Sequence, residues 1–227
     1  MRVEIQRASV EQAAEIAAIK REVWPDEWAD AAYLAAVVAE PDHVTHIGWV
    51  DGLAAGLVSG FVTLDENGVR RWEVDLLGVL PAYRGRGLAI RLVAASTASG
   101  YEIGAAMARG LVAVGNTGSE KAFARAGYGI AAGTCGLYVS DGAAEMQSGD
   151  AAGAYLLPVT TLNYRGIWVE GRITEAGLWQ ARAVRTRYGW QIAGAVIPLA
   201  DTVAAGAAQA AGYALVGQYR WWTHNGR

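Results

Sequence analysis

Residues 77–89 read LGVLPAYRGRGLA. The apolar run of a strand ends at Pro81, a short loop carries two arginines and two glycines, and a helical pattern starts at Leu88 without a break. Glycines let an anion approach the backbone closely, and the unpaired amides of a first helical turn point at it. One such contact contributes only about 0.3–1 kcal/mol, so several amides must act together with Arg84 and Arg86 to hold a diphosphate. The stretch therefore predicts an anion site.

Two other kinds of anion-binding loop fit this stretch less well. A Walker P-loop requires Gly-Lys followed by Ser or Thr, but the lysines of the chain are Lys20 and Lys121, and neither lies in the loop. A dinucleotide fingerprint that starts at Gly85 requires Gly or Ala where Ile90 stands. Both alternatives are disfavoured by the residues themselves.

The composition excludes several classes of protein. The chain has 227 residues, of which 53% are hydrophobic and 18% charged, with a formal net charge of −3. This length suits one large or two small domains, and the hydrophobicity excludes a disordered chain. Domains that bind nucleic acid are usually clearly basic, whereas this chain is mildly acidic, so we expect no nucleic-acid partner.

Other features of the sequence point to a cytoplasmic protein without a metal. The single cysteine, Cys135, cannot form an internal disulfide and leaves no cysteine cluster for zinc, while His43 and His46 in a strand would point to opposite faces. The stretch Met1–Ile5 lacks the apolar run of a signal peptide, and no stretch is apolar enough to span a membrane. We therefore expect a cytoplasmic protein with no metal and no membrane partner.

Periodicity extends the prediction over the first 140 residues. Turn pairs at Asp51-Gly52 and Asn67-Gly68 indicate antiparallel hairpins, and a strand, helix and strand in succession imply a right-handed crossover with parallel strands. The predicted elements are two helices, of which the second is capped by Asp26 and ends at Pro41, strands over 44–50, 53–64 and 69–80, a helix over 87–100, a strand over 111–114, a helix over 116–126 and a strand region over 128–140.

The second part of the chain echoes the end of the first. Residues 141–154 are small and polar and form the predicted linker. Beyond them we expect strands over 162–170, 192–197 and 214–222, with helices over 174–188 and 201–211. The tripeptide Ala-Gly-Tyr at 126–128 recurs at 211–213, and Gly-Leu at 87–88 recurs at 177–178, which favours a partial internal duplication. The second loop, 174–179, has lost both arginines and gained Glu175, so we expect no diphosphate there.

The loop and its surroundings resemble the GNAT superfamily of N-acetyltransferases. The segment Arg84–Ala89 matches the acyl-CoA signature Arg/Gln-x-x-Gly-x-Gly/Ala of that family. Residues 73–83 look like the family's fourth strand and its lead into the loop, and residues 116–128 are similar to a later segment of the family. The resemblance covers about residues 1–140 and supports the prediction that the loop is an anion site.

The resemblance implies a fold and a domain organisation. The fold class is α/β (α+β): a GNAT fold whose mixed central sheet contains splayed parallel strands 4 and 5, followed by a partial second GNAT-like repeat. We expect a GNAT domain over residues 1–140, a linker over 141–154 and a degenerate partial repeat over 155–227. This truncated tandem arrangement also occurs in the family.

The resemblance also implies where the cofactor acetyl-CoA binds. Its diphosphate would lie on the loop amides, and its pantetheine arm would pair with the backbone of the fourth strand near Leu77 and Val79. The residues expected to contact the cofactor are Leu77, Val79, Arg84, Gly85, Arg86, Gly87, Leu88, Ala89, Asn116, Ser119 and Phe123.

The catalytic residues are less well determined by the sequence. Glu73 occupies the family's frequent carboxylate position on the fourth strand, and Asp75 shares its face by strand alternation, so either could take a proton from the amine. Alternatively, both are solvated strand residues that face Arg70 or Arg71.

The family's usual acid, a tyrosine, is replaced by Phe123, which has no proton to give. Tyr128, Ser119 or water could substitute, or the thiolate could leave without an acid. Trp24 and Trp28 flank the segment that shapes the acceptor pocket in similar enzymes, although core packing would equally explain them.

These observations lead to one principal hypothesis and two alternatives. The principal hypothesis is an acetyl-CoA-dependent N-acetyltransferase that acts on the primary amine of a small molecule or of an aminoacyl or peptide N-terminus by direct attack. The first alternative is a catalytically impaired acyl-CoA-binding sensor or scaffold, and the second is a nucleotide-binding protein that uses the same loop. A homodimer is left open.

Overall fold

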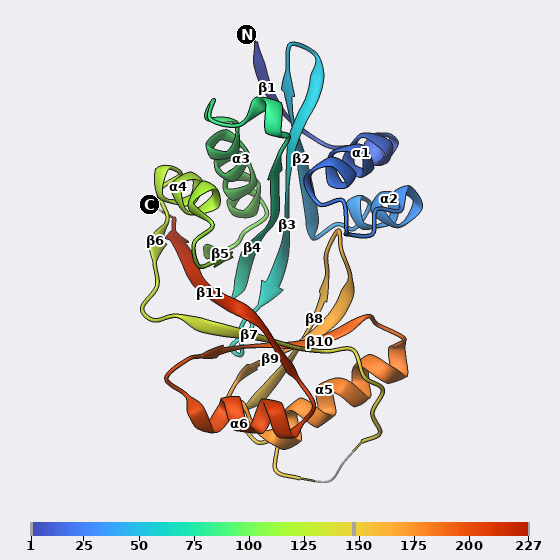
Figure 1. The fold of residues 1–227 in the computed structure, drawn as a ribbon, viewed down its shortest axis with the longest axis vertical. Helices are drawn as coiled ribbons and strands as arrows, with labels where there is room; N and C mark the ends of the chain where they lie inside the picture. Colours follow the sequence, from blue (N-terminus) through green and yellow to red (C-terminus); the bar gives the residue numbers. More distant parts are fainter. Residues whose placement is uncertain (1, 147–148, 227) are drawn as a thin grey trace. The chain divides into compact units, whose positions relative to one another are not determined.

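The computed structural model describes residues 2–146 and 149–226, which form a mixed α/β fold (Figure 1). Contacts divide the chain into two compact units. Unit 1 comprises residues 1–130, 161–163 and 222–227, and unit 2 comprises residues 131–160 and 164–221. The predicted domains, 1–140 and 155–227 with a linker between them, stay a prediction about independent folding.

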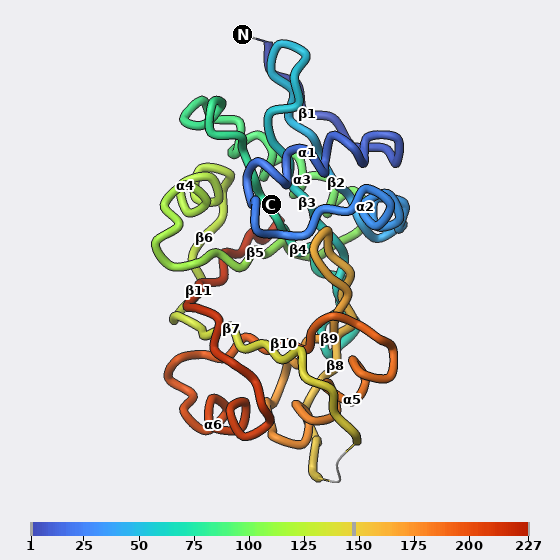
Figure 2. The backbone as a smooth tube through the Cα atoms, turned by 45° about the vertical axis from the view of Figure 1, so that its right-hand side comes forward, coloured from blue at the N-terminus to red at the C-terminus, as the bar shows by residue number. Residues whose placement is uncertain are grey.

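Unit 1 is built on a mixed sheet. Its elements are β1 (Val3–Arg7), the 3₁₀ turn η1 (Val10–Gln12), α1 (Ala13–Val23), α2 (Ala31–Val38), β2 (His43–Val50), β3 (Leu53–Leu64), β4 (Arg70–Val79), η2 (Pro81–Tyr83), α3 (Leu88–Glu102), β5 (Met107–Ala113), α4 (Thr117–Arg125) and β6 (Gly129–Ile130). Strands β1 to β4 are antiparallel neighbours in that order, and β4 pairs with β5 in parallel. The end of β11 (Ala214–Asn225) lies beside β5 and pairs with β6 (Figure 2). The predicted mixed sheet with a parallel pair is confirmed.

Helices cover both faces of this sheet. Helices α1 and α2 lie on one face and α3 and α4 on the other (Figure 1). Successive side chains of a strand alternate between faces, so Trp72 and Val74 of β4 join the core under α3, while Glu73 and Asp75 point to the α1 and α2 face. The two faces of β4 therefore separate a packed core from the polar side chains that were predicted to carry the chemistry.

The ends of the helices follow from local sequence. Ser9 and Gln12 form a capping box at η1. The side chain of Asn116 caps α4 by accepting a hydrogen bond from the Ser119 amide. The prediction that Asp26 caps the second helix is wrong: α2 starts at Ala31, and the Asp30 carboxylate accepts from the Tyr33 amide at 2.8 Å. Residues 24–30, between the two helices, have no helical or strand structure.

Unit 2 contains a second parallel pair. Its elements are β7 (Cys135–Ser140), β8 (Ala154–Thr160), β9 (Arg165–Gly171), α5 (Glu175–Tyr188), β10 (Ile192–Pro198), α6 (Thr202–Ala210) and the larger part of β11. Strands β9 and β10 are parallel and joined through α5. Thr174 and Asp201 cap α5 and α6.

The sequence-based prediction for unit 2 needs two corrections. Strand β8 was not predicted. Leu162, which was predicted to begin a strand, lies before β9 instead, and its side chain is buried in the apolar core of unit 1. The internal duplication stays a prediction.

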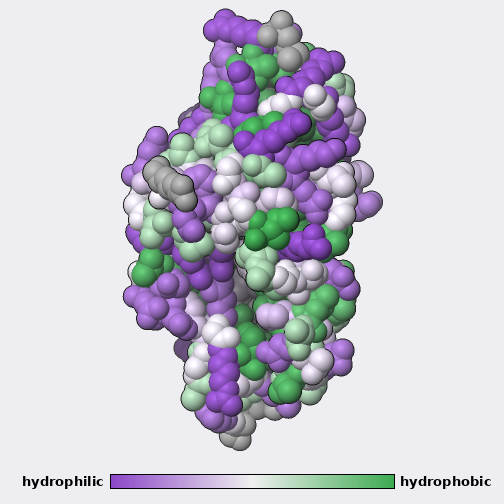
Figure 3. All heavy atoms as spheres, turned by 90° about the vertical axis from the view of Figure 1, so that its left-hand side faces the viewer, coloured by the Kyte–Doolittle hydropathy of each residue, from purple (hydrophilic) through white to green (hydrophobic). Residues whose placement is uncertain are grey.

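The surface of the molecule is mixed in character. On the face shown in Figure 3, hydrophilic and hydrophobic residues are interspersed. Within residues 2–146 and 149–226, no helix combines the length and the apolar character needed to cross a membrane.

Two buried histidines of β2 make the stability of unit 1 depend on pH. His43 is 2% exposed and lies 2.6 Å from the Ser59 hydroxyl, and His46 is 6% exposed and lies 3.2 Å from the Ser99 hydroxyl of α3. They point to opposite faces of the sheet, as predicted. Burial lowers the pKa of each imidazole from 6.5 to about 4.

We predict that the stability of the protein falls as the pH drops from 6.5 toward 4. The unfolded chain binds protons on His43 and His46 in this window and the folded chain does not, so each costs up to about 1.4 kcal/mol per pH unit. Urea unfolding of the wild type and of His43→Gln at pH 7, 6 and 5 measures the effect, and the variant should show the shallower slope. Equal slopes in the two proteins would contradict the prediction.

Candidate active site

The most informative feature of unit 1 is a fork between β4 and β5. Parallel pairing joins Arg71 to Met107, Trp72 to Ala108 and Glu73 to Arg109. Beyond this point β4 runs on to Val79 and β5 to Ala113, with no further pairing between them among the described residues. The facing edges of both strands therefore have backbone groups that the sheet does not use. The predicted splayed pair is confirmed.

A bulge in β4 lies directly beyond the fork. Leu76 has a φ of 42°, and the pairing of β3 with β4 shifts in register between Leu57 and Ser59, opposite this point. A leucine in the left-handed region is strained, and such strain is concentrated at functional sites. The bulge redirects the backbone of β4 at Leu76 and Leu77, the part of the strand that was expected to pair with pantetheine.

The loop after β4 has the geometry of an anion site. Gly85 and Gly87 have φ of 75° and 78°, and a Cβ at either position would meet nothing within 4 Å. Gly87 is the N-cap of α3 and supplies no side-chain cap, so the first-turn amides of α3 remain directed outward. The exposed side chains of Arg84 and Arg86 flank them. A diphosphate fits this set of donors.

Arg84 also ties the loop to the strand. Its Nε donates a hydrogen bond to the carbonyl oxygen of Val79 at 2.9 Å. Leu88 is buried and anchors the start of α3 in the core, so its expected contribution to the cofactor comes from its backbone amide. Ala89 is half-buried next to it.

Glu73 is held at the fork by several donors. The Nε of Arg109 donates to both of its carboxylate oxygens at 2.8 and 2.9 Å, and the Thr63 hydroxyl donates to Oε1 at 2.5 Å. Arg71 Nε lies 3.8 Å from the same oxygen. With 8% of its surface exposed and these partners in place, Glu73 joins the two strands, and the geometry favours this structural role over proton transfer. The sequence had suggested Arg70 or Arg71 as the partner and missed Arg109.

Asp75 has a different environment on the same face. It is half-buried, and burial raises the pKa of its carboxyl to about 6, while the Leu76 amide and the Lys20 ammonium act in the opposite direction. A carboxylate with this pKa is ionised at neutral pH and still basic enough to take a proton. Of the two predicted carboxylates, Asp75 is the better placed for acid–base work.

The aromatic residues near the fork belong to the core under α3 and α4. Phe123 and Tyr128 are buried with their ring centroids 4.9 Å apart, and Trp222 lies 6.3 Å from Phe123. The Tyr128 hydroxyl lies 2.7 Å from that of Thr97, and burial raises the pKa of Tyr128 above its usual value. This environment does not favour Tyr128 as a proton donor. Phe123 and Ser119 lie on α4, whose N-terminus follows β5.

The Trp24 side chain packs against β4, and the Trp28 side chain lies at the surface. A Cβ on Gly78 would be 2.5 Å from the Trp24 ring, so the glycine provides the space for the indole against the strand. Trp28 is 54% exposed, and its ring centroid is 4.9 Å from that of Tyr33. The segment between α1 and α2 thus presents one indole to β4 and a second to solvent.

Sequence analysis missed Lys20 as a part of this site. It is 0% exposed, and its ammonium donates to the Leu162 carbonyl oxygen at 2.8 Å and to the Asn163 side-chain oxygen. A signal was present, because Lys20 follows Ile16 at helical spacing and so lies on the apolar face of α1. Asn163 gave no signal, because its contacts are far away in the sequence.

The fork, the bulge and the amide-rich loop lie on β4 and directly after it, where the resemblance to acetyltransferases predicts that acyl-CoA binds. A model of the acetyltransferase (GNAT) family matches residues 10–128, and the chain belongs to this family. It is therefore an acetyltransferase, and acetyl-CoA is its acetyl donor. No match was found among curated protein sequences.

Solved structures share the fold at low sequence identity. A putative acetyltransferase from Pyrococcus horikoshii is 10% identical with a TM-score of 0.63, over 99% of this chain and 90% of that one. A glucosamine N-acetyltransferase region of a fungal multi-domain β-N-acetylglucosaminidase is 12% identical with a TM-score of 0.63, over 98% of this chain and 38% of that one. The aminoglycoside acetyltransferase AAC(6')-Iy, solved with a bisubstrate analogue, is 23% identical with a TM-score of 0.51, over 56% of this chain and 90% of that one.

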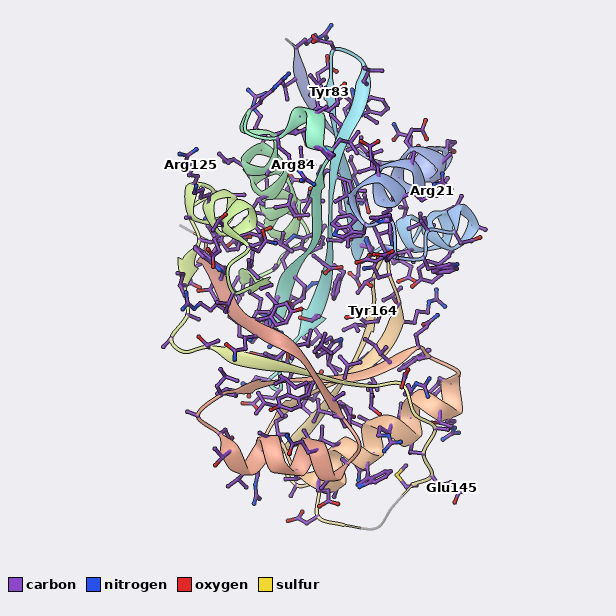
Figure 4. The ribbon with its side chains drawn as sticks, viewed as in Figure 1. Arg21, Tyr83, Arg84, Arg125, Glu145 and Tyr164 are labelled. Carbon is purple, nitrogen blue, oxygen red and sulfur yellow. The ribbon has the colours of Figure 1, made fainter. Side chains whose placement is uncertain are left out.

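We predict that Arg84→Glu weakens coenzyme A binding about tenfold or more, because a carboxylate beside the loop amides repels the diphosphate. Isothermal titration calorimetry with coenzyme A measures the affinity. Arg125→Glu, at the C-terminal end of α4, makes the same change of charge away from the loop and serves as the control (Figure 4). Equal affinity in Arg84→Glu and in the wild type would sink the assignment of the loop.

We predict that Glu73→Gln lowers the free energy of unfolding by about 3 kcal/mol, because it leaves Arg109, whose side chain is 15% exposed, without this charged partner. Urea unfolding measures this change, and Glu66→Gln in the turn after β3, where the side chain is exposed, is the matched control. If Glu73→Gln keeps full stability and loses only turnover, the carboxylate is a base and the structural role is wrong.

Proposed function

We propose that this chain is an N-acetyltransferase that moves the acetyl group of acetyl-CoA directly to a primary amine. The acceptor is the amine of a small molecule or of an aminoacyl or peptide N-terminus. The observation that carries the proposal is the combination, within unit 1, of the loop at Arg84 to Ala89 with a half-buried carboxylate, Asp75, next to the bulge of β4. The first feature holds the donor, and the second prepares the acceptor.

The donor side depends on the backbone. The amides from Arg84 to Ala89 hold the diphosphate, and the edge of β4 at Leu77 and Val79, which pairs with no strand beyond the fork among the described residues, takes the pantetheine arm. Acetyl-CoA, when bound, supplies a thioester carbonyl next to β4. Backbone amides of β4 at the bulge stabilise the negative charge that develops on that carbonyl oxygen. Asn116 and Ser119, at the start of α4, form the side of the cofactor site next to β5, and Phe123 is buried in the core.

Asp75 acts as the general base. An amine with a pKa near 10.4 is only about one part in two thousand neutral at pH 7, a deficit of roughly 4–5 kcal/mol before any attack. Asp75 is ionised above pH 6 and accepts the proton directly or through one water. Glu73 supports this role by joining β4 to β5 two residues earlier on the same face.

The leaving group needs no acid from the protein. Phe123 has no proton to give, and the Tyr128 hydroxyl is engaged with Thr97 in the core. The conjugate base of a thiol with a pKa near ~8.5 is a good leaving group and takes its proton from water after it has left, so the reaction proceeds without a dedicated donor.

Residues 24–30 form the acceptor wall. Trp24 covers β4 at Gly78, and Trp28 and Glu27 are exposed in the same segment. An indole face and a carboxylate both favour a cationic amine. The acceptor therefore approaches between this segment and Asp75.

We predict that Asp75→Asn lowers kcat/KM for the amine by about 10²–10⁴ and leaves coenzyme A affinity unchanged, because only the proton acceptor is lost. In the wild type, kcat/KM should fall as the pH drops through about 6, where the Asp75 carboxyl becomes protonated. Thiol release from acetyl-CoA over a panel of amines measures turnover, with Glu66→Gln as the control.

Two outcomes of this experiment would overturn the proposal. Full turnover in Asp75→Asn would remove Asp75 as the base. Calorimetric binding of coenzyme A without turnover on any amine would replace the enzyme by an acyl-CoA-binding sensor or scaffold.

A further inference from the structure

Residues Thr161–Asn163, between β8 and β9, belong to unit 1 although the strands on either side belong to unit 2. Leu162 is 0% exposed and joins the apolar cluster under α1 and α2. Its neighbours in that cluster include Ile16, Ile19, Leu34 and Val37. A short connection that buries a leucine completely is anchored in the core of unit 1, because the burial of a large apolar side chain is strongly favourable.

Polar contacts join the same three residues to α1, to α2 and to the segment between them. The Tyr33 hydroxyl of α2 donates to the Thr161 carbonyl oxygen at 2.9 Å. The Lys20 ammonium of α1 donates to the Leu162 carbonyl oxygen and to the Asn163 side-chain oxygen. The Asn163 side-chain nitrogen donates to the Glu27 carboxylate at 2.9 Å.

The Asn163 amide thus uses both of its ends. Its oxygen accepts from a buried cation, and its nitrogen donates to an exposed anion, so Lys20, Asn163 and Glu27 form one hydrogen-bonded chain. A buried ammonium is tolerated only when acceptors surround it, and residues 162 and 163 supply two of them. Glu27 is thereby fixed from one side, and it lies between Trp24 and Trp28 in the sequence.

The segment that this chain fixes has no regular structure of its own. Residues 24–30 form neither helix nor strand, so no ladder of backbone hydrogen bonds determines their conformation. Contacts from outside the segment must do so, and Asn163 makes the contact to Glu27. The same segment carries the two indoles of the proposed acceptor wall.

We propose that Asn163 is a positioning residue for the acceptor: with Lys20 it holds Glu27 and residues 24–30 in place, so that residues 161–163 set the affinity for the amine. This inference rests on the proposed function for the identity of the wall. It assigns the connection between β8 and β9 a role in acceptor binding, separate from the cofactor loop.

The same chain influences the proposed base. The charged and titratable groups around Asp75 are Lys20 from α1, Glu27 from the segment after it, Glu73 from β4 and His43, which contacts Ser59 of β3 opposite Asp75. Lys20 is the cation among those that shift the Asp75 pKa downward, and the two glutamates shift it upward. Removal of the Lys20 charge should therefore move the acid limb of the pH profile to higher pH.

The test uses the full chain with Asn163→Asp, Asn163→Ala and Lys20→Met. Asn163→Asp keeps the size of the side chain and an acceptor for Lys20, but it loses the donor to Glu27 and adds a like charge. We expect KM for the amine to rise about tenfold or more in both Asn163 variants, with KM for acetyl-CoA unchanged, because a hydrogen bond to a charged group is lost. Asn67→Ala, in the exposed turn before β4, is the control.

Lys20→Met tests a quantity that a purely structural role would leave unchanged, the pH dependence of kcat/KM. The acid limb of kcat/KM should shift to higher pH, whereas simple loss of folded protein would lower the whole profile without displacing it. If Lys20→Met does not fold, Asn163→Asp gives the same reading, because the added carboxylate also raises the pKa of Asp75.

A second measurement needs no turnover. Hydrogen exchange, followed by mass spectrometry, should show faster exchange over residues 24–30 in Asn163→Ala and Asn163→Asp than in the wild type or Asn67→Ala. If the wild type acetylates an amine but the Asn163 variants keep its KM, or raise the KM of acetyl-CoA equally, the positioning role is wrong and the enzyme stands. If the wild type acetylates no amine, the proposed function fails, and unchanged exchange over residues 24–30 would remove the positioning role as well.

Discussion

The ion pair between Glu73 and Arg109 determines where the site can form. It joins β4 and β5 at the last residues that the two parallel strands pair, and beyond it the strands separate. A buried ion pair is costly unless further hydrogen bonds satisfy it, and here Thr63 and Arg71 contribute. Without a fixed end to the pairing, the two strands would pair further and close the free edge of β4. The carboxylate that the family pattern marks on β4 therefore serves first to hold the fork.

Two adjacent residues of β4, Asp75 and Leu76, lower the stability of the fold at neutral pH. The folded pKa of Asp75, about 6, lies above the ordinary value of 3.8, so this carboxyl favours the fold below pH 3.8 and loses that contribution as the pH rises through 6. At neutral pH its ionised form thus opposes folding. Leu76, the next residue, adds the strain of a left-handed backbone. Two adjacent unfavourable features beside the fork are more readily explained by a reacting site than by the needs of packing.

Local patterns predicted the parts of the site that depend on local structure. The loop, the helix starts near Asn116 and Thr174, and the shared face of Glu73 and Asp75 all follow from residues close together in the chain. Arg109 and Asn163 could not be found this way, because register between distant strands and the burial of Leu162 are set by tertiary packing. The misplaced cap of α2 has the same origin: Asp26 and Asp30 are both good N-caps, and packing of Leu34 and Val37 decides between them.

The two crossovers of the chain show that an anion site depends on the helix cap and not on the crossover. Both α3 and α5 follow a strand and lead into a parallel partner. At α5 the Thr174 hydroxyl accepts a hydrogen bond from the Gly177 amide at 3.1 Å, and Glu175 occupies the first turn, so one donor at that N-terminus is already satisfied and a negative charge is in place. At α3 the N-cap is Gly87, which has no side chain to satisfy those amides. The N-terminus of α3 in unit 1 therefore has amides that are available to a diphosphate, whereas the N-terminus of α5 in unit 2 is less suited to one.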